Sequence, residues 1–176
     1  CCFVDRQRLG GLRLSCTRFA DLLRAGHDLV VFPEATSGDG SAVLPFRPAC
    51  FAAALAADTP VQPLALRYER VGGRPCTPRL RRQVAWYGDM TFLPHLIRLL
   101  ALPRIDARWQ RLPPCHGEER KALAREAREA IATALDLPQH GPDRRRTTAA
   151  DALHASPTPL GFAAMSAPVV VVVPPR

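Results

Sequence analysis

The segment of residues 28–51 constrains the fold of this chain most strongly. It opens with an apolar run at residues 29–32, which is typical of a strand buried on both faces, as in a parallel sheet between helices. Pro33 ends the strand because it has no N–H to donate to a neighbouring strand. A polar loop follows at residues 34–40. Because ligands of open α/β sheets bind beyond the carboxyl ends of the strands, this loop is the predicted functional site.

The other elements alternate between strands and helices. Hydrophobic periodicity predicts helices at residues 12–24, 48–57, 92–102 and 118–137, and strands at residues 2–4, 29–32, 60–68, 83–87 and 104–112. This order predicts an α/β fold with a mixed, mostly parallel sheet flanked by helices, in one domain over residues 1–137. Residues 138–176 have no periodicity and are rich in Pro, Ala, Thr and Ser, so they are predicted to be a disordered tail.

The formal net charge of +8 comes almost entirely from arginine, since Lys121 is the only lysine. Such a charge favours an anionic partner, which includes a membrane surface, an acidic substrate or nucleic acid. The same composition is also typical of a GC-rich bacterial proteome that uses Arg in place of Lys. The six cysteines form no C-x-x-C pair and no histidine lies at metal-ligand spacing from them, so no metal site is predicted.

Four sequence blocks resemble those of one enzyme family. FPEATS at residues 32–37 resembles the F-P-E-G-T-R-S block of the glycerolipid acyltransferases, and LPFR at residues 44–47 resembles the segment that follows it. FVDR at residues 3–6 is similar to the F-I-D-R block, and PVQPLAL at residues 60–66 is similar to the V-P-V-x-P-V-x-I block. The order and spacing of these blocks indicate a relationship to the 1-acylglycerol-3-phosphate acyltransferase family.

This resemblance implies a glycerol-3-phosphate acyltransferase-like fold and an O-acyltransferase. The enzyme would move a fatty acyl group from acyl-CoA or acyl-carrier protein, which are co-substrates, to a lysolipid hydroxyl, with no bound cofactor or metal. Glu34, Thr36 and Ser37 would shape the acceptor site, and Arg6 and Arg47 would hold the polar head. A guanidinium beyond a strand end suits a phosphate or a carboxylate. The acceptor would be lysophosphatidic acid or lyso-ornithine lipid.

Two features are similar to the branch that acylates lyso-ornithine lipid. These are WYGDM at residues 86–90, with Phe92 and His95 after it, and the pattern T-S-x-D-G at residues 36–40. Ser37 stands where the phosphatidate-forming members have an arginine that binds phosphate. Because a serine carries no charge, this position offers no charged hydrogen bond to a phosphate, so the sequence indicates a phosphate head group less strongly.

The family's catalytic block, His-x-x-x-x-Asp, has no counterpart in the chain. In that block the histidine is the general base for the acceptor hydroxyl and the aspartate orients it. None of the five histidines has an aspartate five residues later. The block would precede Cys1, so the chain is expected to be truncated at its N-terminus and inactive alone. Ala35 also replaces a family glycine, which would strain the loop if this position needs a positive φ.

Two further hypotheses stay open. The first is a catalytically inactive remnant of the family that binds lipid or a membrane. The second is a basic nucleic-acid-binding domain, which only the charge suggests, because no nucleic-acid-binding motif is present. The family resemblance places the protein at the cytoplasmic face of a bacterial inner membrane, either peripheral or anchored by a segment upstream of Cys1. The apolar helix at residues 92–102 and the arginines favour an anionic bilayer.

Overall fold

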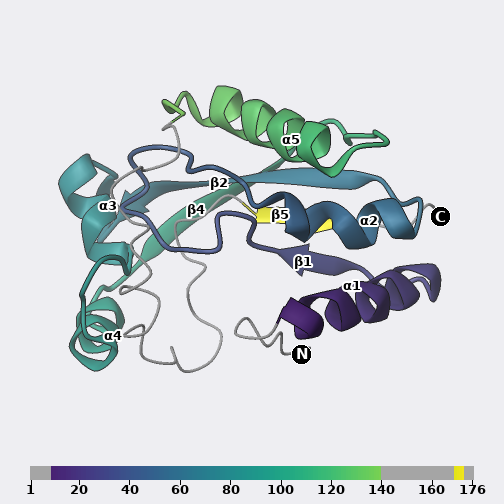
Figure 1. Ribbon diagram of the computed structural model, residues 1–176. Coiled ribbons are helices and arrows are strands. Elements are labelled where there is room, and N and C mark those ends of the chain that lie inside the picture. The colour runs from purple at the N-terminus through teal and green to yellow at the C-terminus, as the bar shows by residue number, and fades with distance from the viewer. Residues whose placement is uncertain (1–8, 140–168, 173–176) are drawn as a thin grey trace.

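The computed structural model describes residues 9–139 and 169–172 of the chain. The elements, in chain order, are α1 (Leu9–Arg24), β1 (Leu29–Val31), the 3-10 helix η1 (Pro48–Phe51), α2 (Ala52–Ala56), β2 (Val61–Val71), β3 (Arg74–Pro75), α3 (Pro78–Val84), α4 (Phe92–Leu100), β4 (Ile105–Arg111), α5 (Arg120–Leu135) and β5 (Val169–Val172) (Figure 1). The mixed α/β class is therefore confirmed. The predicted strand at residues 2–4 lies outside the described residues.

The strands form one sheet in the order β1-β5-β2-β3, and β4 pairs with β2. Every strand pairing among the described residues is antiparallel, so the prediction of a mostly parallel sheet is wrong. β1 and β2 do run in the same direction, as expected for two strands joined through helices. They are not neighbours, however, because β5 lies between them, with Val171 opposite both Val30 and Gln62.

Strand β5 corrects the prediction of a disordered tail for Val169–Val172. Consecutive valines have a high strand propensity because their branched side chains suit a pleated surface. β1 and β2 supply backbone hydrogen-bond partners on both sides of β5. These partners lie far away in the sequence, so local composition does not reveal them. The predicted domain boundary near Leu137 stays a prediction.

The segment between β2 and α4 also differs from its prediction. β2 continues to Val71, where Gly72 and Gly73, with φ values of 60° and 76°, turn the chain into β3. The predicted strand at residues 83–87 is wrong, because α3 extends to Val84. Thr77 caps this helix by accepting a hydrogen bond from the Leu80 N–H at 3.3 Å, and a proline occupies its first turn.

The hydrophobic core lies between α5, β2 and the segment formed by η1 and α2. Its buried members include Phe51, Ala54, Val61, Ala65, Leu123, Ala127 and Ile131. Figure 1 shows α5 above β2 and α1 below β1, and α1 packs on α2. Arg67 donates hydrogen bonds to the Ala134 and Leu135 carbonyls at the end of α5, which then stops at Asp136 in a left-handed conformation.

Candidate acceptor-binding site

The loop between β1 and η1 folds back on itself, so that its two ends lie side by side. The Arg47 N–H donates a hydrogen bond to the Pro33 carbonyl at 2.8 Å. The Leu44 N–H donates to the carboxylate of Glu34 at 2.7 Å. These two bonds bring the Pro-Glu turn and the Leu-Pro-Phe-Arg segment together, although they are ten or more residues apart in the sequence.

The side chain of Glu34 is directed into the protein. The residue is only 4% exposed, which distinguishes it from the polar residues that follow it in the loop. Burial raises the pKa of Glu34 to about 7, while the hydrogen bond from Leu44 and the positive charge of Arg128 oppose this rise. The carboxyl group therefore titrates near neutral pH, and its position indicates that it holds the loop in shape.

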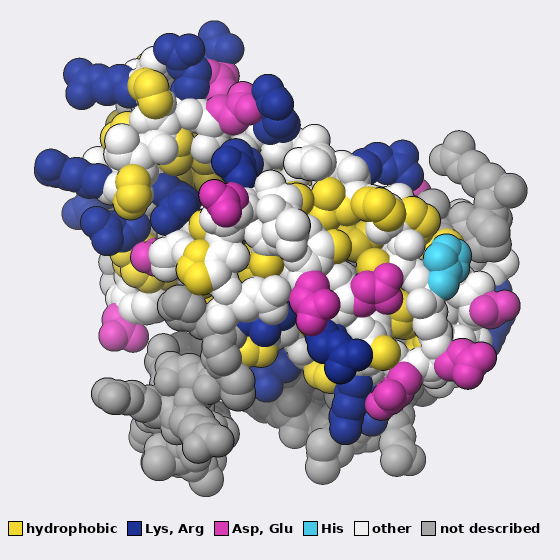
Figure 2. Space-filling model, turned by 90° about the horizontal axis from the view of Figure 1, so that it is seen from above, with side chains coloured by type: hydrophobic (Ala, Val, Ile, Leu, Met, Phe, Trp, Pro, Cys, Tyr) yellow, Lys and Arg dark blue, Asp and Glu magenta, His cyan; other side chains and the backbone are white. Residues whose placement is uncertain are grey.

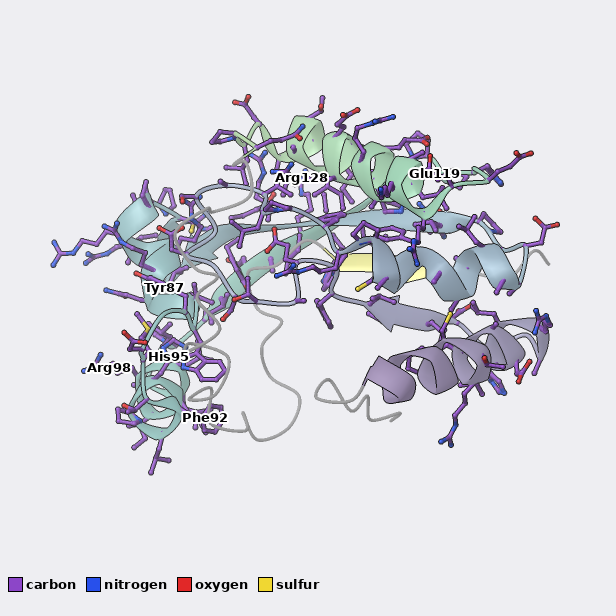
Figure 3. The ribbon with its side chains drawn as sticks, viewed as in Figure 1. Tyr87, Phe92, His95, Arg98, Glu119 and Arg128 are labelled. Carbon is purple, nitrogen blue, oxygen red and sulfur yellow. The ribbon has the colours of Figure 1, made fainter. Side chains whose placement is uncertain are left out.

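Helix α5 anchors the same loop through Arg128 (Figure 3). Its Nη2 atom donates a hydrogen bond to the Val43 carbonyl at 2.7 Å, and its charge acts on Glu34. The Val43 N–H donates to the Pro138 carbonyl at 3.1 Å, just after the helix ends. Both backbone groups of Val43 thus bond to the α5 region, and Val43 itself is buried. The loop is therefore fixed against α5.

Helix α3 holds the middle of the loop, which runs toward it in Figure 1. Arg81 Nε donates to the Asp39 carbonyl at 3.2 Å, and the Asp39 carboxylate accepts bonds from the N–H and hydroxyl of Ser41 at 3.0 and 2.6 Å. Burial would raise the pKa of Asp39, but these hydrogen bonds and the charges of Arg81 and Arg82 lower it below its usual value. At Gly40, with φ of 72°, a Cβ would lie 3.0 Å from Arg81 Cδ, so a side chain there would be both strained and crowded.

Ala35 has a φ of 55°, which is the left-handed region. Position 35 therefore has the positive φ at which an alanine is expected to strain the loop. The Ala35 N–H donates to the Phe32 carbonyl at 3.2 Å, so a tight turn imposes this conformation. A non-glycine residue there costs roughly 1–2 kcal/mol. The geometry also explains why the related F-P-E-G-T-R-S block has a glycine at this place.

The predicted site residues fall into two groups. Thr36 and Arg47 are exposed and Ser37 is half-buried, whereas Glu34 is buried. Arg6 lies outside the described residues. The structure therefore brings the Glu34 turn and the Arg47 segment together, but it directs Glu34 inward and leaves Thr36 and Arg47 at the surface. Their roles in binding an acceptor stay predictions.

Sequence reasoning missed Arg128 and Arg81, which hold the loop from two helices. The position of Arg128 in α5 carries a usable signal, because it lies four residues after Ala124 and three before Ile131, both of which are buried. A charged residue so close to an apolar helical stripe often has a buried partner. Arg81 has no comparable signal, since it is one of three arginines in a short helix.

Hydroxyl groups and a guanidinium at the loop surface can bind a polar or anionic head group by hydrogen bonds and charge. In the part of the chain that the structure describes, no group of three or more His, Cys, Asp or Glu side chains is arranged to hold a metal ion.

Comparisons with known proteins identify relatives of the chain. Residues 1–67 match the Acyltransferase family model. A Lyso-ornithine lipid O-acyltransferase of Brucella abortus is 38% identical over 133 residues, which are 70% of this chain and 50% of that protein. The protein of the same name from Pseudomonas aeruginosa is 37% identical over 132 residues, which are 74% of this chain and 49% of that protein.

The chain thus spans about half the length of these curated relatives. No solved structure matches it significantly. The family match and the relatives agree with the resemblance of the blocks around Glu34 and Arg47. The chain therefore belongs to the acyltransferase family.

Proposed function

We propose that this chain forms the lysolipid-binding part of an O-acyltransferase of bacterial membrane lipid synthesis. The acyl donor would be acyl-CoA or acyl-carrier protein, and the acceptor would be lyso-ornithine lipid. The observation that carries this proposal is the identity of 37–38% to two lyso-ornithine lipid O-acyltransferases over more than two thirds of the chain. Such an enzyme would work at the cytoplasmic face of the inner membrane.

In this reaction the acceptor hydroxyl oxygen bonds to the thioester carbonyl carbon, the C–S bond breaks and the thiol leaves. The hydroxyl proton must pass to a general base. No histidine of the chain has an aspartate five residues later, so the chain lacks the family's base motif. We therefore assign to these 176 residues the binding of the acceptor, and we expect no transfer by them alone.

Different loop residues would make different contacts with the acceptor. Thr36 and Ser37 would donate hydrogen bonds to the head group, because Thr36 is exposed and Ser37 is only half-buried. Arg47 and Arg6 would pair with the carboxylate of the ornithine head. Glu34, which is buried, would fix the shape of the turn through the hydrogen bond that it accepts from the Leu44 N–H. The uncharged Ser37 favours lyso-ornithine lipid over lysophosphatidic acid.

Lipid analysis in a bacterial strain that lacks its own lyso-ornithine lipid O-acyltransferase tests the proposal. The gene is expressed once with its genomic upstream sequence and once as the 176 residues, and the Pseudomonas aeruginosa relative serves as the positive control. We expect ornithine lipid in the first case and none in the second. Absence of ornithine lipid from both, with the control active, would contradict the proposed activity.

A second candidate function is a catalytically inactive lipid-binding protein. The strained Ala35 favours it. This candidate predicts that the purified chain binds lyso-ornithine lipid while no expressed form makes ornithine lipid.

A further inference from the structure

Helix α4 presents an apolar stripe to solvent. Leu93, Ile97 and Leu100 are 63%, 60% and 75% exposed, and none of the residues of α4 is buried. Their spacing of four and three residues places them on one side of the helix. Apolar residues grouped in this way on a surface mark an interaction site, in contrast to single exposed ones.

The position of α4 is fixed by aromatic contacts. The Trp86 indole N–H donates to the Met90 carbonyl at 2.7 Å, and the Trp86 ring meets the Phe92 ring edge-to-face at 5.9 Å. These contacts hold the turn that connects α3 to α4. The helix therefore keeps its apolar stripe outward as part of a defined structure.

The segment that contains this stripe is rich in positive charge. Residues 78–100 contain four arginines and a single acidic residue, Asp89. Arg79, Arg82 and Arg98 are exposed. In Figure 2, which is seen from above, Lys and Arg side chains gather at the left, the side on which α3 lies above α4 in Figure 1. Figure 3 shows Arg98 and Phe92 on different sides of α4.

We propose that α3 and α4 form a docking surface for an anionic phospholipid bilayer, with α4 lying in the plane of the interface. Its residues are Leu93, Ile97 and Leu100, which enter the acyl-chain boundary, and Arg79, Arg82 and Arg98, which meet the lipid phosphates. The combination of an apolar helix stripe with exposed arginines on the same helix pair is typical of interfacial helices. In the described residues no helix is long and apolar enough to cross a bilayer.

Docking at this surface gives the acceptor loop access to lipid. Arg81 of α3 donates to the Asp39 carbonyl, so the loop is tied to α3 two residues after Ser37. This consequence rests on the proposed function, whereas the docking itself does not.

Flotation of the full 176-residue chain with vesicles tests the docking surface. The vesicles contain phosphatidylcholine with or without phosphatidylglycerol, at low and high salt, and no lysolipid. We expect binding only with phosphatidylglycerol. The variant Leu93→Ser/Ile97→Ser/Leu100→Ser is expected to lower the partition coefficient by more than about tenfold. Arg79→Gln/Arg82→Gln/Arg98→Gln is expected to lower it about fivefold for each arginine and to weaken the salt dependence.

Matched controls keep these outcomes interpretable. Val30→Ser/Trp109→Ser changes two other exposed apolar residues, at 60% and 55%, and Arg120→Gln/Arg125→Gln changes exposed arginines of α5. Both should bind as the wild type, and thermal unfolding checks that every variant is folded.

Equal vesicle binding by the α4 variant and the wild type would overturn the proposal. So would a wild-type dimer that the α4 variant converts to a monomer while vesicle binding is unchanged, because a second copy would then be the partner. Since the vesicles contain neither acceptor nor acyl donor, these results do not depend on whether the protein transfers acyl groups.

Discussion

The carboxylate of Glu34 accepts a hydrogen bond of 2.7 Å from the backbone N–H of Leu44. This bond ties the turn after β1 to the segment that carries Arg47, and the second bond, from the Arg47 N–H to the Pro33 carbonyl, reinforces it. The loop shape therefore depends on a buried ionisable group. Its stability should respond to pH and to changes in the residues around Glu34.

Stability should fall as the pH rises through the range in which Glu34 titrates. Its folded-state pKa of about 7 lies above the ordinary 4.5, so the folded state binds more protons than the unfolded state between these values. The stabilising contribution of the protonated Glu34 to the free energy of unfolding is fully present below pH 4.5 and is lost as the pH rises through about 7. Its upper limit is about 3 kcal/mol. Urea unfolding of wild type and Glu34→Gln at pH 5 and pH 8 measures it.

The glutamine keeps the acceptor for the Leu44 N–H and has no charge to bury. We expect Glu34→Gln to be less sensitive to pH than the wild type and at least as stable at pH 8. Glu119→Gln, an exposed change, is the control. Identical pH slopes for the wild type and Glu34→Gln would show that Glu34 is not the titrating group.

Replacement of Arg128 should destabilise the loop. Arg128→Met removes the hydrogen bond to Val43 and the positive charge that opposes the rise of the Glu34 pKa. We expect a loss of about 1–3 kcal/mol, larger at pH 8 than at pH 5 because Glu34 is ionised at the higher pH. Arg125→Met, at an exposed place in the same helix, should change stability much less. An equal loss in both variants would contradict the role of Arg128.

Ala35→Gly should stabilise the protein. Glycine relieves the strain at φ 55°, although its greater freedom in the unfolded chain offsets part of the gain, so we expect about 0.5–1 kcal/mol. Ala52→Gly is the matched control, because Ala52 has a φ of −65° and the same exchange should destabilise there. A destabilised Ala35→Gly would mean that the turn does not require the left-handed conformation.

Changes at the loop surface should affect the acceptor and leave stability intact. In a form of the protein that transfers acyl groups, Arg47→Gln should raise KM for lyso-ornithine lipid about tenfold, since a charged hydrogen bond to its carboxylate is lost. Ser37→Arg should improve the use of lysophosphatidic acid relative to lyso-ornithine lipid. Steady-state kinetics with both acceptors, and unfolding of each variant, separate these effects from misfolding.

Much of the fold follows from local pattern, and the exceptions have physical causes. β1, α4 and α5 were predictable because each has a clear run or periodicity of apolar residues and a recognisable end. α3 was missed because the arginines and prolines around it are typical of a loop, whereas the Thr77 cap and Pro78 start a helix. β5 was missed because its strand partners are distant in the sequence.

The candidate site, too, was only partly predictable from local sequence. Its location after β1 was predictable because it depends on neighbouring residues, whereas a positive φ at position 35 was only a condition suggested by the glycine of the related block. The burial of Glu34 and its link to Leu44 were not predictable, because they depend on the loop folding back and on Arg128 from a distant helix. Thr36 and Arg47 are accessible, as acceptor binding requires, and their contacts with a lipid await measurement.

The most direct test of the central claim is a transfer assay with purified protein expressed from the gene with its genomic upstream sequence. Lyso-ornithine lipid and lysophosphatidic acid are offered together, with acyl-carrier protein or CoA thioesters as donors, and the products are identified by mass spectrometry. Our account predicts ornithine lipid as the main product. Phosphatidic acid as the main product, or no transfer to either lysolipid, would contradict it.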